Sequence, residues 1–156
     1  MRTLKIGLAV VLTLTTIGVP AAQNNWMSFG QDPGATKFST LDQITTDNVK
    51  NLERAWTFHT GDKSGFFESG LLVVDGVMYF SAPNGVYALD AATGTQIWKY
   101  ETSGTARRGP LYWPGGSGVG PRIFSQTDNG LAAIDPATGN RIAGADPRRD
   151  CYAIAY

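Results

Sequence analysis

Few side chains in this sequence are of the types that commonly do chemistry, and they stand far apart. The single histidine, His59, has no second ligand residue at a spacing typical of a metal site. The single cysteine, Cys151, lies close to the C-terminal end and cannot form an internal disulfide. Both residues therefore suggest structural roles, and the sequence predicts no metal ligands and no catalytic thiol.

Glu68 and the pair Arg107-Arg108 are the remaining candidates. Glu68 comes shortly before a predicted strand, and the two arginines lie in a loop rich in glycine and serine, 102–120. Judged by residue type alone, the glutamate is a solvated side chain and the arginines are surface charge. A function for them depends on the elements that position them.

A repeat organises those elements. Residues 84–98 read Asn-Gly-Val-Tyr-Ala-Leu-Asp-Ala-Ala-Thr-Gly-Thr-Gln-Ile-Trp, and residues 129–142 read Asn-Gly-Leu-Ala-Ala-Ile-Asp-Pro-Ala-Thr-Gly-Asn-Arg-Ile. The aspartate of each copy is 45 residues from its counterpart, and so is the second glycine. A repeat of about 40–45 residues made of short strands is typical of β-propeller blades.

The first repeat completes a predicted antiparallel meander of four strands. Asp75-Gly76 is a pair that tolerates positive φ, so it suits a tight hairpin. The second unit is less complete, and Ala143 stands where the first has Trp98. The predicted fold is all-β, a partial β-propeller of about two four-stranded blades. Strands are expected at 71–74, 77–81, 86–89 and 96–100, then at 122–126 and 131–134.

The region before the first blade has a weaker pattern. Residues 23–45 suggest an extended arm that carries aromatic residues, and Thr45–Leu52 suggests a short helix capped by Thr45. Residues 52–60 alternate as a strand does, which places Trp56 and Phe58 on one face.

The N-terminus has the features of a secretory signal. Arg2 and Lys5 precede an apolar run at 6–19, and small residues follow it. We expect a signal peptide at 1–22, propeller blades at 23–143 and a divergent tail at 144–156. The expected location of the mature chain is the periplasm or the exterior of the cell.

Composition narrows the expected partners. The formal net charge is zero and 17% of the residues are charged, so no basic excess suggests nucleic acid. Propellers usually have about four to eight blades, and a ring must close to protect its edges. The chain is therefore expected to be a fragment or one part of an assembly, with the missing blades as partners.

Several stretches together resemble the N-terminal part of the quinoprotein dehydrogenases, eight-bladed propellers that use pyrroloquinoline quinone (PQQ) to oxidise alcohols or sugars. The resemblance covers about residues 24–143, which is nearly all of the expected mature chain. The matching stretches are Trp26–Asp32, Thr36–Leu52, Ala55–Phe58, Phe67-Glu68, Val73–Ser81, Ala88–Trp98 and Arg108–Gly115.

The resemblance implies roles for particular residues. Glu68 matches the glutamate that hydrogen-bonds PQQ, and Arg108 matches the arginine that contacts its carboxylate and quinone oxygens. A guanidinium can hold paired oxygens in its plane, which suits a tricarboxylate. Arg107 is interpreted as surface charge, and Trp113 is given a structural role. Ala88–Trp98 matches the family's tryptophan docking motif, in which the tryptophan stacks between blades.

The resemblance also implies a reaction that this chain does not complete. In the family Ca²⁺ polarises the quinone, an aspartate takes the substrate proton, and electrons pass to a quinone or cytochrome c. The calcium ligands and that aspartate are expected outside this chain, so no catalytic residue is assigned here. We expect a truncated chain that is inactive alone.

The sequence departs from the family pattern at two places, and the second bears on the predicted substrate class. Ser69-Gly70-Leu71 replaces the usual Thr-Pro pair, and no adjacent cysteine pair lies near Arg108. The missing pair favours a sugar-oxidising (glucose-type) or cysteine-free subgroup. The alternative is a non-catalytic propeller segment that binds proteins, like the scaffolds of outer-membrane assembly. Glu68 and the Arg108 loop favour the enzyme, because a scaffold has no need of them.

Overall fold

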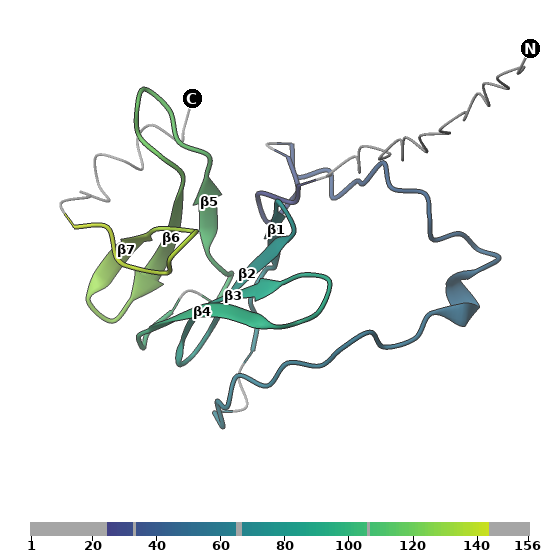
Figure 1. Cartoon of the computed structure of the whole chain (residues 1–156), viewed down its shortest axis with the longest axis horizontal. Coiled ribbons are helices and arrows are strands. Elements are labelled where there is room, and N and C mark those ends of the chain that lie inside the picture. The colour runs from purple at the N-terminus through teal and green to yellow at the C-terminus, as the bar shows by residue number, and fades with distance from the viewer. Residues whose placement is uncertain (1–24, 33, 65–66, 106, 144–156) are drawn as a thin grey trace, which may run out of the picture.

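The computed structural model describes residues 25–32, 34–64, 67–105 and 107–143. These residues form two antiparallel β-sheets that pack face to face (Figure 1). The predicted signal peptide and divergent tail lie outside the described residues. The all-β prediction is confirmed, and no helix in the described part of the chain is long and apolar enough to cross a membrane.

The first sheet, here sheet A, is the predicted four-stranded meander. At its first hairpin Asp75 and Gly76 have φ angles of 50° and 79°, which is the left-handed turn that the Asp-Gly pair predicted. The strand order is the sequence order. The strands are β1 (Leu72–Val74), β2 (Val77–Ala82), β3 (Gly85–Asp90) and β4 (Gln96–Glu101).

The second sheet, here sheet B, has three strands among the described residues, β5 (Leu111–Trp113), β6 (Arg122–Thr127) and β7 (Gly130–Ile134). The prediction of an unbroken loop at 102–120 was wrong, because β5 lies within it. β5 is only three residues long and prolines flank it at 110 and 114, so it lacked a strand-like run. The fourth position of sheet B holds an isolated bridge from Arg141 to Ile134.

The two repeats have the same turn geometry. The Gly94 N–H donates to the Asp90 carbonyl at 2.8 Å, and the Gly139 N–H donates to the Asp135 carbonyl at 2.8 Å. In each turn the aspartate carboxylate also accepts from two following backbone N–H groups. The Leu89↔Gln96 pair of sheet A recurs as the Ile134–Arg141 bridge of sheet B. The sequence repeat is therefore a structural repeat.

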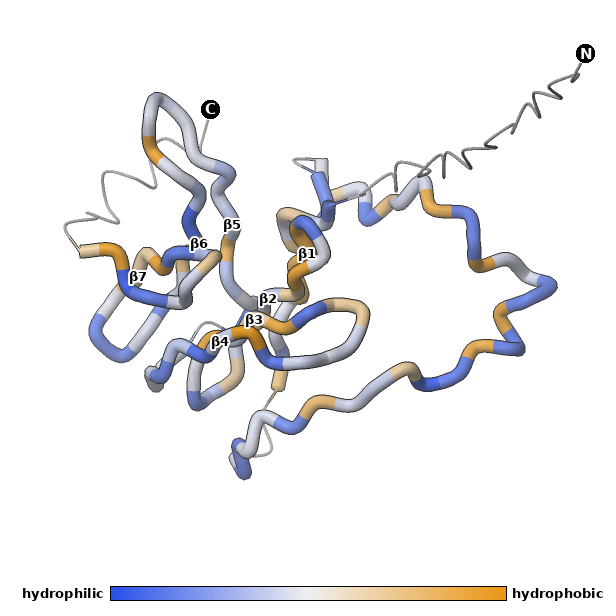
Figure 2. Tube along the Cα trace, in the orientation of Figure 1, coloured by the Kyte–Doolittle hydropathy of each residue, from blue (hydrophilic) through white to orange (hydrophobic). Residues whose placement is uncertain are grey.

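The main core lies between the sheets. Val86 and Ala88 of sheet A are fully buried in one cluster with Ile123 and Ile134 of sheet B. A smaller cluster covers the opposite face of sheet A, where the rings of Phe80 and Tyr87 stack with their centroids 5.2 Å apart. Figure 2 shows hydrophobic residues gathered along the strands of both sheets.

Two tryptophans join neighbouring units in the same way. The indole Nε1 of Trp98 donates to the Pro136 carbonyl at 2.8 Å, and its ring lies so close to Gly139 that a Cβ there would be 2.6 Å away. Trp98 thus docks on the second repeat, as the motif predicts. The Nε1 of Trp56 donates to the Ala91 carbonyl at 3.2 Å, and its ring covers Gly94 likewise. This docking role of Trp56 was not predicted from the sequence.

The region before sheet A differs from its prediction. The expected helix at 45–52 shortens to the 3-10 helix η1 (Val49–Asn51). Residues 52–60 are extended, but no strand in the described residues pairs with them, so the predicted strand is not formed. Trp56 and Phe58 still share a face and pack on the smaller cluster. Figure 1 shows this region as a wide loop leaving the sheets.

Candidate functional site

The backbone brings the segments of Glu68 and Arg108 together. The Gly70 N–H donates to the Arg108 carbonyl at 3.2 Å. Gly109 has a φ of 90°, and a Cβ on it would overlap the carbonyl oxygen of Gly70. A Cβ on Gly70 would in turn lie 2.9 Å from the Arg108 carbonyl. Both glycines are needed for this close approach.

The end of β2 anchors both segments. The Ser81 N–H donates to Ser69 Oγ at 3.0 Å, which fixes the segment after Glu68. The Thr105 hydroxyl donates to the Ala82 carbonyl at 2.8 Å, which fixes the arginine loop. Two segments about forty residues apart in sequence are thus held by neighbouring residues of one buried strand.

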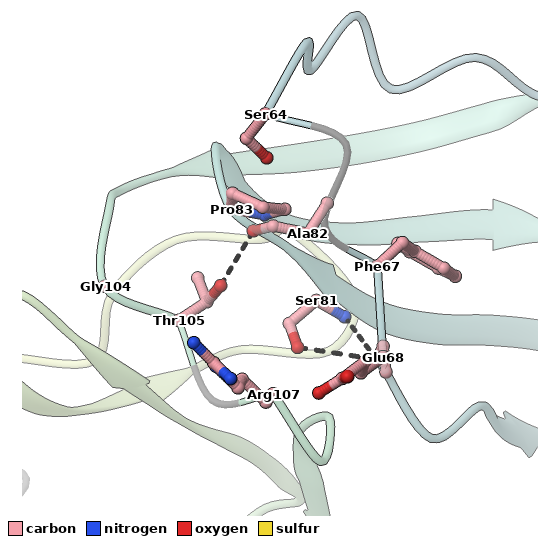
Figure 3. Close-up of a pocket in the computed structure, with 10 residues that line it drawn as sticks. Ser64, Phe67, Glu68, Ser81, Ala82, Pro83, Gly104, Thr105 and Arg107 are labelled. Atoms are coloured by element: carbon pink, nitrogen blue, oxygen red, sulfur yellow. Dashed lines mark hydrogen bonds between the residues drawn. The ribbon is translucent and has the colours of Figure 1, made fainter.

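A cavity of about 270 Å³ opens between these segments. Figure 3 shows the Glu68 carboxylate and the Arg107 guanidinium on either side of it, with Phe67 at its rim. Glu68 and Arg107 are exposed, and Phe67 exposes 56% of its surface. The cavity therefore presents a carboxylate, a guanidinium and an aromatic ring to solvent.

Arg108 faces a neighbouring hollow instead. Together with Thr105, Arg107 and Gln126 it lines a space of about 440 Å³. Arg107 borders both spaces, so the two arginines form one basic edge beside Glu68. From the sequence, Arg107 was expected to be surface charge. Its position beside Arg108 in an irregular loop gave no signal of which arginine would share a cavity with the glutamate.

This arrangement suits an anionic, hydrogen-bonding ligand. Guanidinium groups make strong, charge-assisted bonds to carboxylates, and Glu68 can accept from donors on a ring. Across the described ranges no group of three His, Cys, Asp or Glu side chains could hold a metal. His59 lies outside this cavity, in the groove along sheet A. The cavity is therefore a candidate binding site, which carries no metal-ligating group among the described residues.

Comparison with known proteins gives the family. The model of the glucose/ethanol/alcohol dehydrogenase β-propeller domain, named for PQQ, matches residues 26–145. The chain is 38% identical over 137 residues to methanol dehydrogenase (cytochrome c) subunit 1 of Methylorubrum extorquens, covering 78% of this chain and 22% of that protein. It is 35% identical over 130 residues to the quinohemoprotein alcohol dehydrogenase of Comamonas testosteroni, covering 76% and 18%.

Solved structures agree with the sequence matches. The quinohemoprotein alcohol dehydrogenase ADHIIG of Pseudomonas putida superposes with a TM-score of 0.65 at 36% identity, over 76% of this chain and 18% of that one. A europium-containing methanol dehydrogenase gives a TM-score of 0.60 at 33% identity, over 75% and 22%. The chain spans about a fifth of the length of the curated relatives it matches. It belongs to the PQQ dehydrogenase β-propeller family.

Proposed function

We propose that this chain is the N-terminal, cofactor-binding part of an exported PQQ-dependent dehydrogenase. The observation that carries the proposal is the backbone contact between Gly70 and Arg108, which sets the arginine loop beside Glu68. The Glu68 carboxylate and the Arg107 guanidinium both line one open cavity. A planar tricarboxylate explains why both charges are there.

The side chains at the cavity have the charges and hydrogen-bonding groups that PQQ requires. Arg107 and Arg108 supply two guanidiniums for its carboxylate and quinone oxygens, and Glu68 accepts from its ring or orients a neighbouring donor. Phe67 offers an apolar surface at the rim. PQQ, when bound, supplies the oxidation of the alcohol by accepting its electrons. The role of this chain's residues is to bind and orient the cofactor.

The substrate class is an alcohol, with a sugar hydroxyl as the alternative. The relatives include a 1-butanol dehydrogenase (cytochrome c) and a methanol dehydrogenase (cytochrome c), which supports an alcohol and a cytochrome c acceptor. The missing cysteine pair supports the sugar-type alternative. Calcium ligands and the proton-accepting aspartate are supplied by the remaining blades, so the chain alone gives no turnover.

A binding experiment tests the proposal. Purified chain is titrated with PQQ, with Ca²⁺ present, and binding is followed by tryptophan fluorescence and by PQQ absorbance. Glu68→Gln and Arg108→Gln should each weaken binding by at least about tenfold, because a hydrogen bond to a charged group is lost. Arg54→Gln, an exposed arginine outside the site, should leave binding unchanged.

A chimeric enzyme provides a second test of the proposed PQQ site. Residues 23–143 replace the matching part of the Comamonas testosteroni alcohol dehydrogenase, and PQQ content is measured after purification. Retained PQQ that is lost with Glu68→Gln and Arg108→Gln supports the site. A folded chimera that holds no PQQ, or holds it equally well in both variants, contradicts it. PQQ-dependent dye reduction by the chain alone would contradict the assignment of catalytic groups to other blades.

A further inference from the structure

We propose that Phe29 is a positioning residue of the candidate site. Its ring covers the contact between Gly70 and the Arg108 carbonyl, and so keeps the Glu68 segment (residues 67–71) beside the arginine loop. The effect on PQQ rests on the proposed function, whereas the positioning itself can be measured without PQQ. Phe29 is assigned no contact with a ligand, because it acts through the backbone of the Glu68 segment.

The ring of Phe29 lies where the two site segments touch. A Cβ on Gly70 would be 2.8 Å from Cδ2 of Phe29 and 2.9 Å from the Arg108 carbonyl oxygen. The ring, the glycine and the carbonyl therefore meet at one place. The Gly70 N–H donates to this carbonyl at 3.2 Å, at the long end of the range for such hydrogen bonds. A ring beside the bond excludes water from it, and a lower local dielectric strengthens it.

The Glu68 segment depends on contacts of this kind because of its own sequence. It has Ser69-Gly70-Leu71 where the family pattern has a Thr-Pro pair. Proline fixes its own φ, whereas glycine has the greatest backbone freedom of all residues. A segment that reaches β1 through a glycine therefore needs restraints from outside. Phe29 provides one at the glycine itself.

Core packing does not account for the position of Phe29. The residue exposes 61% of its surface, and it belongs to neither hydrophobic cluster of the described residues. The Lys37 Nζ lies 5.3 Å from the centroid of its ring, within the range of a cation–π interaction. An exposed phenylalanine is thus held between a cation and the backbone of Gly70.

The loop that carries Phe29, residues 28–37, is closed by its own hydrogen bonds. The Lys37 N–H donates to the Gly30 carbonyl at 2.9 Å. The Asp32 carboxylate accepts from both the backbone N–H and the hydroxyl of Thr36. The loop is therefore a preformed support for the ring.

Strand β1 anchors this loop to the sheet that carries the site. The Trp26 N–H donates to the Val73 carbonyl at 2.7 Å, and the Val73 N–H donates to the Trp26 carbonyl at 2.9 Å. The side chain of Asn25 makes two further hydrogen bonds, to the carboxylate and the backbone N–H of Asp75. Figure 1 shows these first described residues, in purple, beside β1. The loop and the Glu68 segment are both joined to β1, which sets the ring against the glycine.

Amide hydrogen exchange of the isotope-labelled chain, followed by NMR, measures the positioning without PQQ. In Phe29→Ala the Gly70 amide should exchange about tenfold faster than in the wild type or more, because local opening no longer has to displace the ring. Amides of β3 should keep their protection. Phe29→Tyr retains the ring and should protect Gly70 as the wild type does. Phe38→Ala is the matched control, since Phe38 is also exposed, at 66%, and lies outside this contact.

Three results of the exchange experiment overturn the proposal. One is a Gly70 amide that exchanges equally fast in the wild type and in Phe29→Ala. Another is an equal acceleration in Phe38→Ala. The third is a loss of protection in β3 as well, which would make Phe29 a general stabilising residue.

A double-mutant cycle on PQQ binding tests whether Phe29 acts through Glu68. Phe29→Ala should weaken PQQ binding by about fivefold or more in the wild type but by less than about twofold in Glu68→Gln, because the side chain that it positions is already lost. Equal losses in both backgrounds overturn the proposal. If the wild-type chain binds no PQQ, the proposed function fails, and the exchange experiment alone decides whether Phe29 positions the Glu68 segment.

Discussion

At the scale of single residues, Gly109 decides whether the two halves of the candidate site can meet. Its φ of 90° is unfavourable for other residues, and the backbone of Gly70 occupies the space of a Cβ. Residue type alone did not identify Glu68 and Arg108 as site residues; the family resemblance did. The sequence did not predict that Arg107 shares the cavity with Glu68, because neighbouring loop residues have no fixed periodicity that assigns them to one side.

Gly109→Ala is expected to destabilise the chain and weaken PQQ binding together. The substitution adds backbone strain of about 1–3 kcal/mol and forces Gly70 away from the arginine loop. Gly118→Ala is the matched control, since Gly118 also has a positive φ of 81° but nothing lies within 4 Å of its added Cβ. Urea unfolding and the PQQ titration measure both effects. Equal PQQ affinity in the two variants would contradict the role of Gly109.

Asp90, also a single residue, makes the stability of the folded chain depend on pH. The hydroxyl and the backbone N–H of Thr93 hold the pKa of Asp90 below its ordinary value of 3.8. The folded chain therefore favours the ionised carboxylate. This stabilisation is complete above the ordinary pKa and is lost as the pH falls through the lower, folded value.

The measurement is the free energy of unfolding as a function of pH in the acid range. The wild type should lose stability more steeply than Asp90→Asn, which has no carboxylate to titrate at this position. Parallel curves for the two chains would show that the turn does not depend on this charge.

At the scale of elements, turns were predictable and isolated strands were not. Asp75-Gly76 specified its hairpin through the backbone freedom of two residues, a purely local effect. β5 was missed because three residues carry too little pattern, and it forms by pairing with β6. Residues 52–60 have a strand's alternation but no partner among the described residues, and alternation alone does not make a ladder.

Trp98→Ala tests the contact between elements. The indole is 8% exposed and bonds the Pro136 carbonyl, so its removal should cost about 3–5 kcal/mol of unfolding free energy. Trp113→Ala is the control, because Trp113 is only half-buried and lies outside the core between the sheets. Chemical denaturation checks both. If Trp98→Ala lost less unfolding free energy than Trp113→Ala, the docking role of Trp98 would be contradicted.

At the scale of the whole molecule, stability depends on the seam between the sheets. Burial there, with the nearby Tyr112 hydroxyl as the next cause, raises the pKa of Tyr79 to about 12. The ring of Tyr79 also stacks on that of Tyr112, with centroids 6.5 Å apart. The seam was predictable as a blade-to-blade contact, but the tyrosine pair depends on β5, which the sequence did not reveal.

Tyr79 predicts an alkaline limit to this seam. Its stabilising effect is complete below the ordinary pKa of 10.0 and is lost as the pH rises toward about 12, because the unfolded chain ionises first. The wild-type unfolding free energy should therefore fall over this interval. Tyr79→Phe should remove this part of the decline, which unfolding curves at a series of pH values will show. If wild type and Tyr79→Phe showed the same decline of unfolding free energy with pH, burial of the Tyr79 hydroxyl would be contradicted.

The anchoring of both site segments on the end of β2 has a consequence for how variation in this chain is interpreted. Phe80, next to Ser81 on that strand, packs in the smaller core cluster, so its substitution would shift the serine that holds the Glu68 segment. A change in the interior would then appear in experiments as a loss of ligand affinity. The core and the site are therefore mechanically coupled through one strand, β2.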